Sequence, residues 1–134
     1  MTATITPDSE IQILEKKLAI QEDAMQRLIL LDKLSDHYTY TNTRRAQRLL
    51  AEQLEILKIF DQPDLKLNYH LNTGFIENQL YNFTLAEIHF KDAIEILEER
   101  GDANQLAEVY IDYAGTCMNL HLYDKAKEYL AQKG

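Results

Sequence analysis

Apolar residues recur at intervals of three and four along almost the whole chain, which is the spacing of one face of an α-helix. They fall into four runs: Leu28, Leu31 and Leu34; Leu49, Leu50, Leu54 and Leu57; Ile94 and Leu97; and Tyr110, Tyr113, Cys117 and Leu120. The breaks between the expected helices are short. The pattern therefore predicts an all-α chain of successive amphipathic helices.

Prolines, glycines and asparagines mark the expected ends of these helices. Pro63, within the break 61–64, stands where a new helix can begin, and Gly101 suits a helix C-terminus. Asn42 and Asn82 are expected N-caps, with side chains that accept hydrogen bonds from the first amides of the next helix.

The pattern repeats when the sequence is shifted by 40 residues, which is the signature of an internal repeat. The coinciding sets are Ala46, Ala86 and Ala126; Leu50, Phe90 and Leu130; Thr43, Phe83 and Tyr123; Leu34, Gly74 and Ala114; Leu31, Leu71 and Ile111; Ile56 and Ile96; and Leu57 and Leu97. The break 61–64 likewise coincides with 101–104.

These residues resemble the tetratricopeptide repeat (TPR) family. Its motif has a small residue in the first helix, an aromatic before the second, then Ala, an aromatic or Leu, and a further Ala. The second unit matches it best, with Gly74, Leu80, Phe83, Ala86, Phe90 and Ala93. The third has Ala114, Leu120, Tyr123, Ala126 and Leu130 but Lys133 in place of the last Ala, and the first is degenerate at Leu34, Thr43 and Gln53.

The resemblance implies a right-handed α-α superhelix, a TPR-like solenoid of about three helix-turn-helix units plus an N-terminal helix. The units would span about residues 25–62, 65–102 and 105–134, with the last one truncated. The family repeat is 34 residues long, so a period of 40 implies helices longer by about six residues. Similar long variants occur in cytoplasmic bacterial signalling and regulatory proteins.

Close packing between the helices of a unit explains the small residues of the motif. Gly74 would let the second helix of its unit approach, and Ala86 and Ala93 would leave room for a ring such as Phe90.

Residues 1–24 form an expected N-terminal segment and helix ahead of the repeat domain 25–134. Ile11, Leu14 and Leu18 have helical spacing, which fits either a dimerising coiled coil or a helix that caps the first repeat. We favour the cap, because only two heptads fit into this stretch.

The expected last helix begins near Asp124 and reaches only Gly134, whereas its counterparts run on to about residues 60 and 100. We therefore expect either a fragment of a longer protein or a repeat face that a partner covers. Homodimer formation through this open C-terminal face is one such arrangement.

Charge and composition limit the kinds of partner and the cellular compartment that we expect. The net charge of −8 disfavours nucleic acid, and we interpret Arg44, Arg45 and Arg48 as a solvated helix face. The chain start does not resemble a signal peptide, and no apolar run approaches the roughly 20 residues of a membrane span. With the single Cys117, these features predict a soluble cytoplasmic protein without a membrane partner.

Motifs for catalysis are missing from the sequence. It contains no phosphate-binding glycine loop, no HExxH pair and no G-x-S-x-G elbow. Cys117 is expected to be a buried small hydrophobe, and structural roles are expected for His37, His70, His89 and His121. We therefore predict that residues 1–134 have no enzymatic activity and hold no cofactor or metal.

Glu77 departs from the repeat pattern, because an inward-facing aromatic is usual at its position. A buried carboxylate needs a partner, and His37 or His70 are the candidates. The alternative that we favour is a solvated crevice around Glu77.

The resemblance implies that a partner peptide or helix lies in the concave groove formed by the first helices of the units. Transferring the groove positions gives Tyr38, Asn68, Leu71, Asn72, Phe75, Asn78, Gln79, Glu108, Ile111, Asp112, Met118 and Asn119, with Leu31, Ser35 and Thr39 from the first unit. Asparagines can bond a peptide backbone through both a donor and an acceptor, and Tyr38, Phe75 and Met118 are candidate apolar anchors.

Members of the family that bind the acidic C-terminal tails of chaperones use a clamp of basic residues and asparagines. Here Asn72 matches the clamp, but Leu31 and Ser35 replace its first members and Glu108 and Asp112 occupy its remaining basic positions. Carboxylates there would repel an anionic tail, so such binding is not expected.

Two function classes follow. The first is a non-catalytic protein-protein interaction module, the N-terminal scaffold or sensing region of a cytoplasmic bacterial signalling protein. The second is the regulatory part of an enzyme, a histidine kinase or nucleotide cyclase, whose catalytic domain would lie beyond Gly134. The partner itself is not identified by the sequence.

Overall fold

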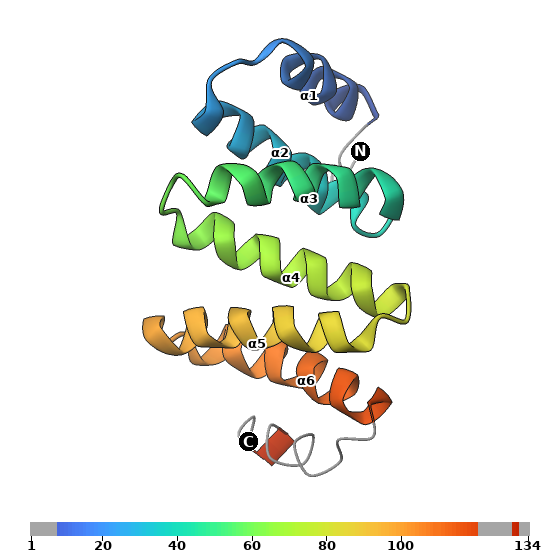
Figure 1. Ribbon diagram of the computed structural model, residues 1–134, viewed down its shortest axis with the longest axis vertical. Coiled ribbons are helices and arrows are strands. Elements are labelled where there is room, and N and C mark those ends of the chain that lie inside the picture. Colours follow the sequence, from blue (N-terminus) through green and yellow to red (C-terminus); the bar gives the residue numbers. More distant parts are fainter. Residues whose placement is uncertain (1–7, 121–129, 132–134) are drawn as a thin grey trace, which may run out of the picture. The chain divides into compact units, whose positions relative to one another are not determined.

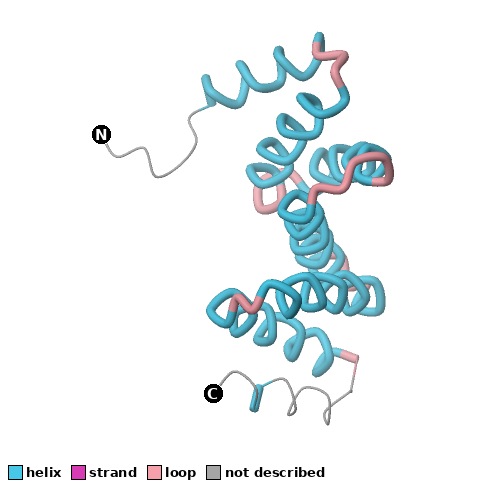
Figure 2. The backbone as a smooth tube through the Cα atoms, turned by 90° about the vertical axis from the view of Figure 1, so that its left-hand side faces the viewer, coloured by secondary structure: helices cyan, strands magenta, loops and turns pink. Residues whose placement is uncertain are grey.

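A computed structural model describes residues 8–120 and 130–131 of the chain. These residues form helices joined by short loops and contain no strand, which confirms the all-α prediction (Figure 2). The helices of this described part are α1 (Asp8–Ile20), α2 (Ala24–Tyr38), α3 (Thr43–Leu57), α4 (Pro63–Gln79), α5 (Phe83–Arg100) and α6 (Ala103–Asn119). None of them combines the length and apolar character that a bilayer crossing requires.

The chain divides into two compact units, and the division falls within α4. Unit 1 is Met1–Tyr69 and unit 2 is His70–Gly134. Within unit 1, α2 packs against both α1 and α3, and within unit 2, α5 packs against α6 (Figure 1). The predicted boundary between residues 24 and 25 stays a prediction.

Three of the four predicted helix-end signals act as expected. Pro63 is the first residue of α4, where its missing N–H leaves no hydrogen bond unmade. Gly101 ends α5 in the left-handed conformation, with φ of 69°. Asn42 caps α3, because its side-chain oxygen accepts from the amide of Arg45 at 3.1 Å.

The fourth signal is only half right. Asn82 lies at the N-cap position of α5 but makes no side-chain capping bond. Instead, its Nδ2 donates to Oε2 of Glu77 at 2.8 Å, so the side chain joins the end of α4 to the following turn.

The 40-residue interval of the sequence recurs in the helix boundaries. The starts of α3 and α5 (Thr43, Phe83), the starts of α4 and α6 (Pro63, Ala103) and the ends of α4 and α6 (Gln79, Asn119) are each 40 residues apart. The ends of α3 and α5 do not follow this interval, because α5 runs on to Arg100. Ala46 and Ala86 are fully buried, as the predicted close packing requires.

The core of unit 1 includes residues of α1. The buried cluster consists of Ile11, Leu18, Leu28, Leu31, Leu34, Leu49 and Ile56. Because Ile11 and Leu18 belong to it, α1 packs its apolar face on α2 within the same chain. Burial of each such side chain contributes roughly 1.5–3 kcal/mol to folding.

The core of unit 2 contains the close contact that the sequence predicts at Gly74. A Cβ added to Gly74 would lie 2.7 Å from Cε1 of Phe90, and the Phe90 ring is fully buried. Other buried apolar residues of this unit are Ile76, Ala86, Ala93, Ile94, Leu97, Val109, Tyr110, Tyr113, Ala114 and Cys117. The burial of Cys117 agrees with its predicted role.

Several predictions fall at or beyond the edge of the described residues. Tyr123, Ala126, His121 and Lys133, and with them most of the predicted last helix, lie outside those residues. Leu130 is described and is exposed, so it does not share the burial of Leu50 and Phe90.

We expect Gly74→Ala to destabilise unit 2, because the new methyl group overlaps a buried ring that has no room to move. Gly115→Ala is the matched control: Gly115 also lies inside a helix, but a Cβ there meets no atom within 4 Å. Since both changes gain the same helix propensity, their difference in unfolding free energy isolates the overlap, at roughly 1–3 kcal/mol. Urea denaturation measures it.

Combining Gly74→Leu with Phe90→Leu places in unit 2 the residues that unit 1 has at the equivalent positions, Leu34 and Leu50. The double variant should recover most of the stability that Gly74→Leu alone loses. Equal effects of Gly74→Ala and Gly115→Ala would contradict the close contact.

Candidate functional site

The predicted groove residues of α6 form one exposed helix face. Glu108, Ile111, Met118 and Asn119 are exposed, and Asp112 is half-buried. Ile111 and Met118, two helical turns apart on this face, keep 43% and 48% of their surface accessible. The structure thus brings together an apolar strip with carboxylates beside it, all within unit 2.

Burial and the neighbouring carboxylate shape the electrostatics of this face. The pKa of Asp112 is raised, first because the carboxyl is partly removed from water and second because Glu108 repels its charge. The face therefore favours ligand groups that donate hydrogen bonds or carry positive charge.

The predicted groove residues on the unit 2 part of α4 are mostly engaged inside the unit. Phe75 packs edge-on against Phe90, with ring centroids 5.5 Å apart. Asn78 Oδ1 accepts from the hydroxyl of Thr116 at 3.1 Å, which joins α4 to α6. Asn72 is buried and Leu71 half-buried, whereas Gln79 is exposed.

In unit 1 the equivalent positions are covered. Leu31, Ser35 and Thr39 are fully buried and present no surface to a partner. Tyr38 donates its hydroxyl to Glu15 of α1 at 2.9 Å, and Asn68 donates to both carboxylate oxygens of Asp32 at 3.3 and 3.4 Å. These contacts come from different helices of unit 1: α1 engages Tyr38, α3 engages Ser35 through Gln53, and α4 supplies Asn68.

Two arginines fix α1 in place, which the sequence did not reveal. Arg45 was expected to be solvated, but it is half-buried and donates through Nε to Glu15 at 3.1 Å. That hydrogen bond is the main cause that lowers the pKa of Glu15. Arg27 donates to the carbonyls of Leu18 and Gln21 at 2.8 and 2.7 Å and pairs with Glu52.

A polar pair replaces apolar packing in the core of unit 1. The hydroxyl of Ser35 donates to Oε1 of Gln53 at 2.7 Å, and both side chains are fully buried. Nε2 of Gln53 has no hydrogen-bond partner among the described residues. Such an unmatched donor costs roughly 1–3 kcal/mol relative to a paired one.

Asp32 is the most perturbed carboxyl of unit 1. Burial raises its pKa from 3.8 to about 6, the repulsion of Asp36 adds to the rise, and the hydrogen bond from Asn68 opposes it. Burial is the largest of these causes, so the perturbation mainly reflects the packing around Asp32.

Two histidines that the sequence presents as scattered meet in unit 2. Nδ1 of His70 lies 3.0 Å from Nδ1 of His89, and Asp92 Oδ2 lies 3.9 Å from His70 Nδ1. Glu77, in the last turn of α4, is half-buried and accepts a hydrogen bond from Asn82, a residue that the sequence did not suggest as its partner. No three His, Cys, Asp or Glu side chains of the described part gather closely enough to hold a metal ion.

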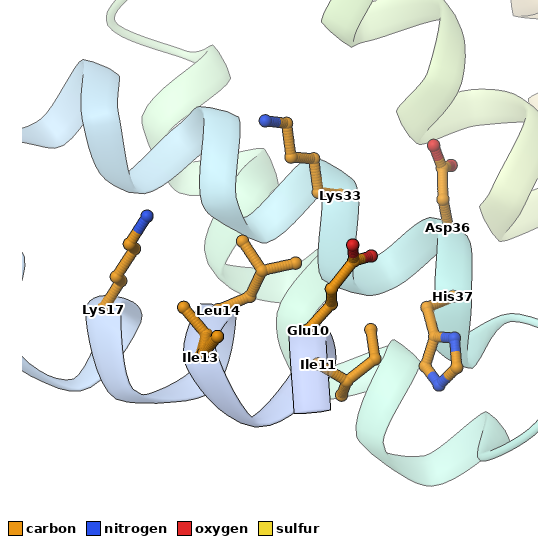
Figure 3. A pocket seen from close by; sticks show the side chains of 8 residues that line it. All are labelled: Glu10, Ile11, Ile13, Leu14, Lys17, Lys33, Asp36 and His37. Carbon is orange, nitrogen blue, oxygen red and sulfur yellow. The ribbon is translucent and has the colours of Figure 1, made fainter. Parts of the chain in front are cut away.

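A cleft of about 590 Å³ lies between α1 and α2 of unit 1 (Figure 3). Its lining consists of Glu10, Ile11, Ile13, Leu14, Lys17, Lys33, Asp36 and His37. Figure 3 shows Glu10, Leu14 and Lys17 reaching from α1 towards α2. This cleft was not predictable from the sequence, because it depends on the angle at which α1 meets α2.

Comparison with known proteins adds no family to this geometry. No protein-family model matches the sequence, and no curated protein matches it. The likeness to tetratricopeptide repeats stays a prediction that rests on residues and their spacing.

We expect unit 1 to gain stability as the pH falls from about 7.5 towards 5. The pKa of Asp32 is higher in the folded state, about 6 against 3.8, so folding is opposed while Asp32 is ionised and the penalty disappears as it takes up its proton. Asp32→Asn should remove the penalty, stabilising unit 1 at neutral pH by at most roughly 3 kcal/mol. Urea titrations at several pH values measure the effect.

Asp36→Asn is the control for Asp32, because Asp36 is an exposed carboxyl one helical turn away. It removes a repelling charge but leaves the buried group, so most of the pH dependence should persist. A pH dependence unchanged by Asp32→Asn would contradict the assignment.

Unit 2 should respond to pH with the opposite sign. Burial lowers the pKa of His89 below 6.5, against the attraction of Asp92 and Glu77, so the folded unit binds fewer protons than the unfolded chain. The stability of unit 2 is therefore lost as the pH falls through 6.5. A second proton on the His70–His89 pair would also place two N–H donors face to face. Hydrogen exchange of the α5 amides measures this loss.

His89→Asn keeps a polar atom near the Nδ1 position without a titrating ring, so it should flatten the dependence of α5 exchange on pH. His37→Asn, in unit 1, is the control and should leave that dependence unchanged. The idea fails if α5 becomes better protected at low pH in the wild type.

Proposed function

We propose that this chain is a non-catalytic protein-protein interaction module built from long tetratricopeptide-like repeats. In this proposal the helices continue as a right-handed solenoid, and the module is the scaffold or sensing region of a cytoplasmic bacterial signalling protein. Its partner is a peptide or helix of another protein.

The observation that carries the proposal is the 40-residue recurrence, seen both in the sequence and in the helix boundaries. A repeated helix pair leaves one apolar face for its neighbour and creates a surface without a catalytic centre. The close contact of Gly74 with Phe90 is the packing that the family motif implies.

The exposed face of α6 is the best candidate for the contact surface. Ile111 and Met118 supply apolar anchors, and Glu108 and Asn119 lie beside them on the same helix. Gly115 is also exposed on this helix, so a partner backbone can approach there closely. A ligand with apolar side chains and a basic or hydrogen-bond-donating group fits this chemistry.

The same chemistry disfavours the acidic tails of chaperones. Glu108 and Asp112 would repel a terminal carboxylate, and the raised pKa of Asp112 shows that this carboxyl already tolerates further negative charge poorly. Such a tail peptide is therefore a negative control for binding experiments.

A displayed peptide library selected on the whole chain tests the proposal, followed by titration of the strongest peptide by calorimetry. We expect Ile111→Glu and Met118→Glu each to weaken binding by about tenfold or more, because each places a charge in an apolar contact. Ile88→Glu is the matched control: Ile88 lies on α5 with 47% of its surface accessible, and its change should leave the affinity unaltered.

Failure to select any peptide, or peptides that bind Ile111→Glu and Met118→Glu as well as the wild type, would refute the α6 face as the contact surface. Micromolar binding of a chaperone tail peptide would refute the placement of the repeats on this sequence.

A further inference from the structure

The cleft between α1 and α2 has its charges sorted by sign along its length. The N-terminal part of α1 faces the C-terminal part of α2, because residues 10–17 line the cleft together with residues 33–37. Glu10 and Asp36 therefore mark one end, and Lys17 and Lys33 lie nearer the other. A second hollow of unit 1 that involves residues 14–21 and 26–33 continues from the lysines.

Apolar side chains lie between these charged ends. Ile13 and Leu14 line the cleft one helical turn from Glu10 on one side and from Lys17 on the other. Ile13 keeps 52% of its surface accessible, whereas Ile11, on the same helix, is buried against α2. Thus Ile11 belongs to the core of unit 1, whereas Ile13 remains exposed.

Three charged side chains on this face are available for a partner. Glu10, Lys17 and Lys33 are exposed and make no ion pair or hydrogen bond within the described part of the chain. Elsewhere on α1, Glu15 is already bonded by Arg45 and Tyr38. Of the exposed charges on α1, Glu10 and Lys17 line the cleft, whereas Lys16 lies outside it.

We propose that this face binds the same face of a second copy of the chain, around a two-fold axis that passes close to Ile13. When this axis lies in the interface and perpendicular to the cleft, it reverses the direction of the cleft, so the acidic end of each copy meets the lysines of the other. Glu10 then faces Lys17 of the second copy and Asp36 faces its Lys33, each pair occurring twice. Ile13 and Leu14 form the apolar centre.

The order of the charges selects this occupant over others. A uniformly acidic helix would pair with the lysines but would be repelled by Glu10 and Asp36. A uniformly basic helix would pair with these carboxylates but would be repelled by the lysines. A second copy supplies both signs in the reversed order. The proposal does not depend on peptide binding at α6, which lies in unit 2.

Charge reversal tests the proposed dimer, with the mass in solution measured by light scattering over a wide range of concentrations. We expect the wild type to dimerise as its concentration rises, and Lys17→Glu or Glu10→Lys alone to raise the dissociation constant at least about tenfold, since each creates two repulsive pairs. The double variant Glu10→Lys with Lys17→Glu restores opposite charges and should restore the dimer. An equimolar mixture of the two single variants should form a heterodimer.

Lys16→Glu is the matched control, because Lys16 is an exposed neighbour on α1 that does not line the cleft. It changes the net charge by the same amount and should leave the dimer intact. A wild type that is monomeric at every concentration overturns the proposal. A dimer that both single reversals leave unchanged also overturns it and places the contact on another face.

Cysteine cross-linking locates the axis independently. Ile13→Cys should form a disulfide between two copies under mild oxidation, because the two Cα atoms would lie close to the axis and within the roughly 7 Å that a disulfide spans. Ile20→Cys, at a more exposed position of the same helix with 81% accessibility, should not. Cross-linking of Ile20→Cys but not of Ile13→Cys would exclude the proposed axis.

Discussion

The packing of unit 2 depends on the space that glycine leaves beside α5. The Phe90 ring is fully buried where a side chain at position 74 would stand, so neither residue can change in size alone. At the equivalent positions, 40 residues earlier, unit 1 has Leu34 and Leu50, both buried. The smallest and a large residue in one repeat correspond to two residues of middle size in the other, so the two repeats fill this contact with different pairs of side chains.

The same comparison relates a buried polar pair of one repeat to two apolar residues of the other. Ser35 and Gln53 form a buried hydrogen-bonded pair in unit 1, and the equivalent residues of unit 2 are Phe75 and Ala93. Unit 1 combines the short Ser35 with the long Gln53, whereas unit 2 combines the large Phe75 with the small Ala93. Gln53 therefore does not mark a failed repeat; it fills the volume that its shorter partner leaves, with one unmatched amide hydrogen donor as the cost.

Periodic features were predictable from the sequence, and contacts between distant side chains were not. The helix ends at Pro63 and Gly101 and the close contact at Gly74 follow from local rules of backbone geometry and size. His70 and His89 are 19 residues apart, and only the register of α4 against α5 brings their rings together. The prediction for Asn82 failed for a similar reason, because a second acceptor, Glu77, competes for the side chain.

The helix α1 decides where this chain has surface left for recognition. It shares a core cluster with Leu31 and engages the hydroxyl of Tyr38, whereas Ser35 is engaged by Gln53 of α3. Leu31, Ser35 and Thr39 are fully buried, so unit 1 offers none of these groove positions to a ligand. The equivalents of Leu31 and Ser35 on α6 are Ile111 and Gly115, which remain exposed in unit 2. The positions that the repeat provides for a partner are thus filled in one unit by the chain itself. The helix α1 also has a second face, which lines the cleft. The charged side chains and the exposed Ile13 on that face have no role in the packing of α1 on α2.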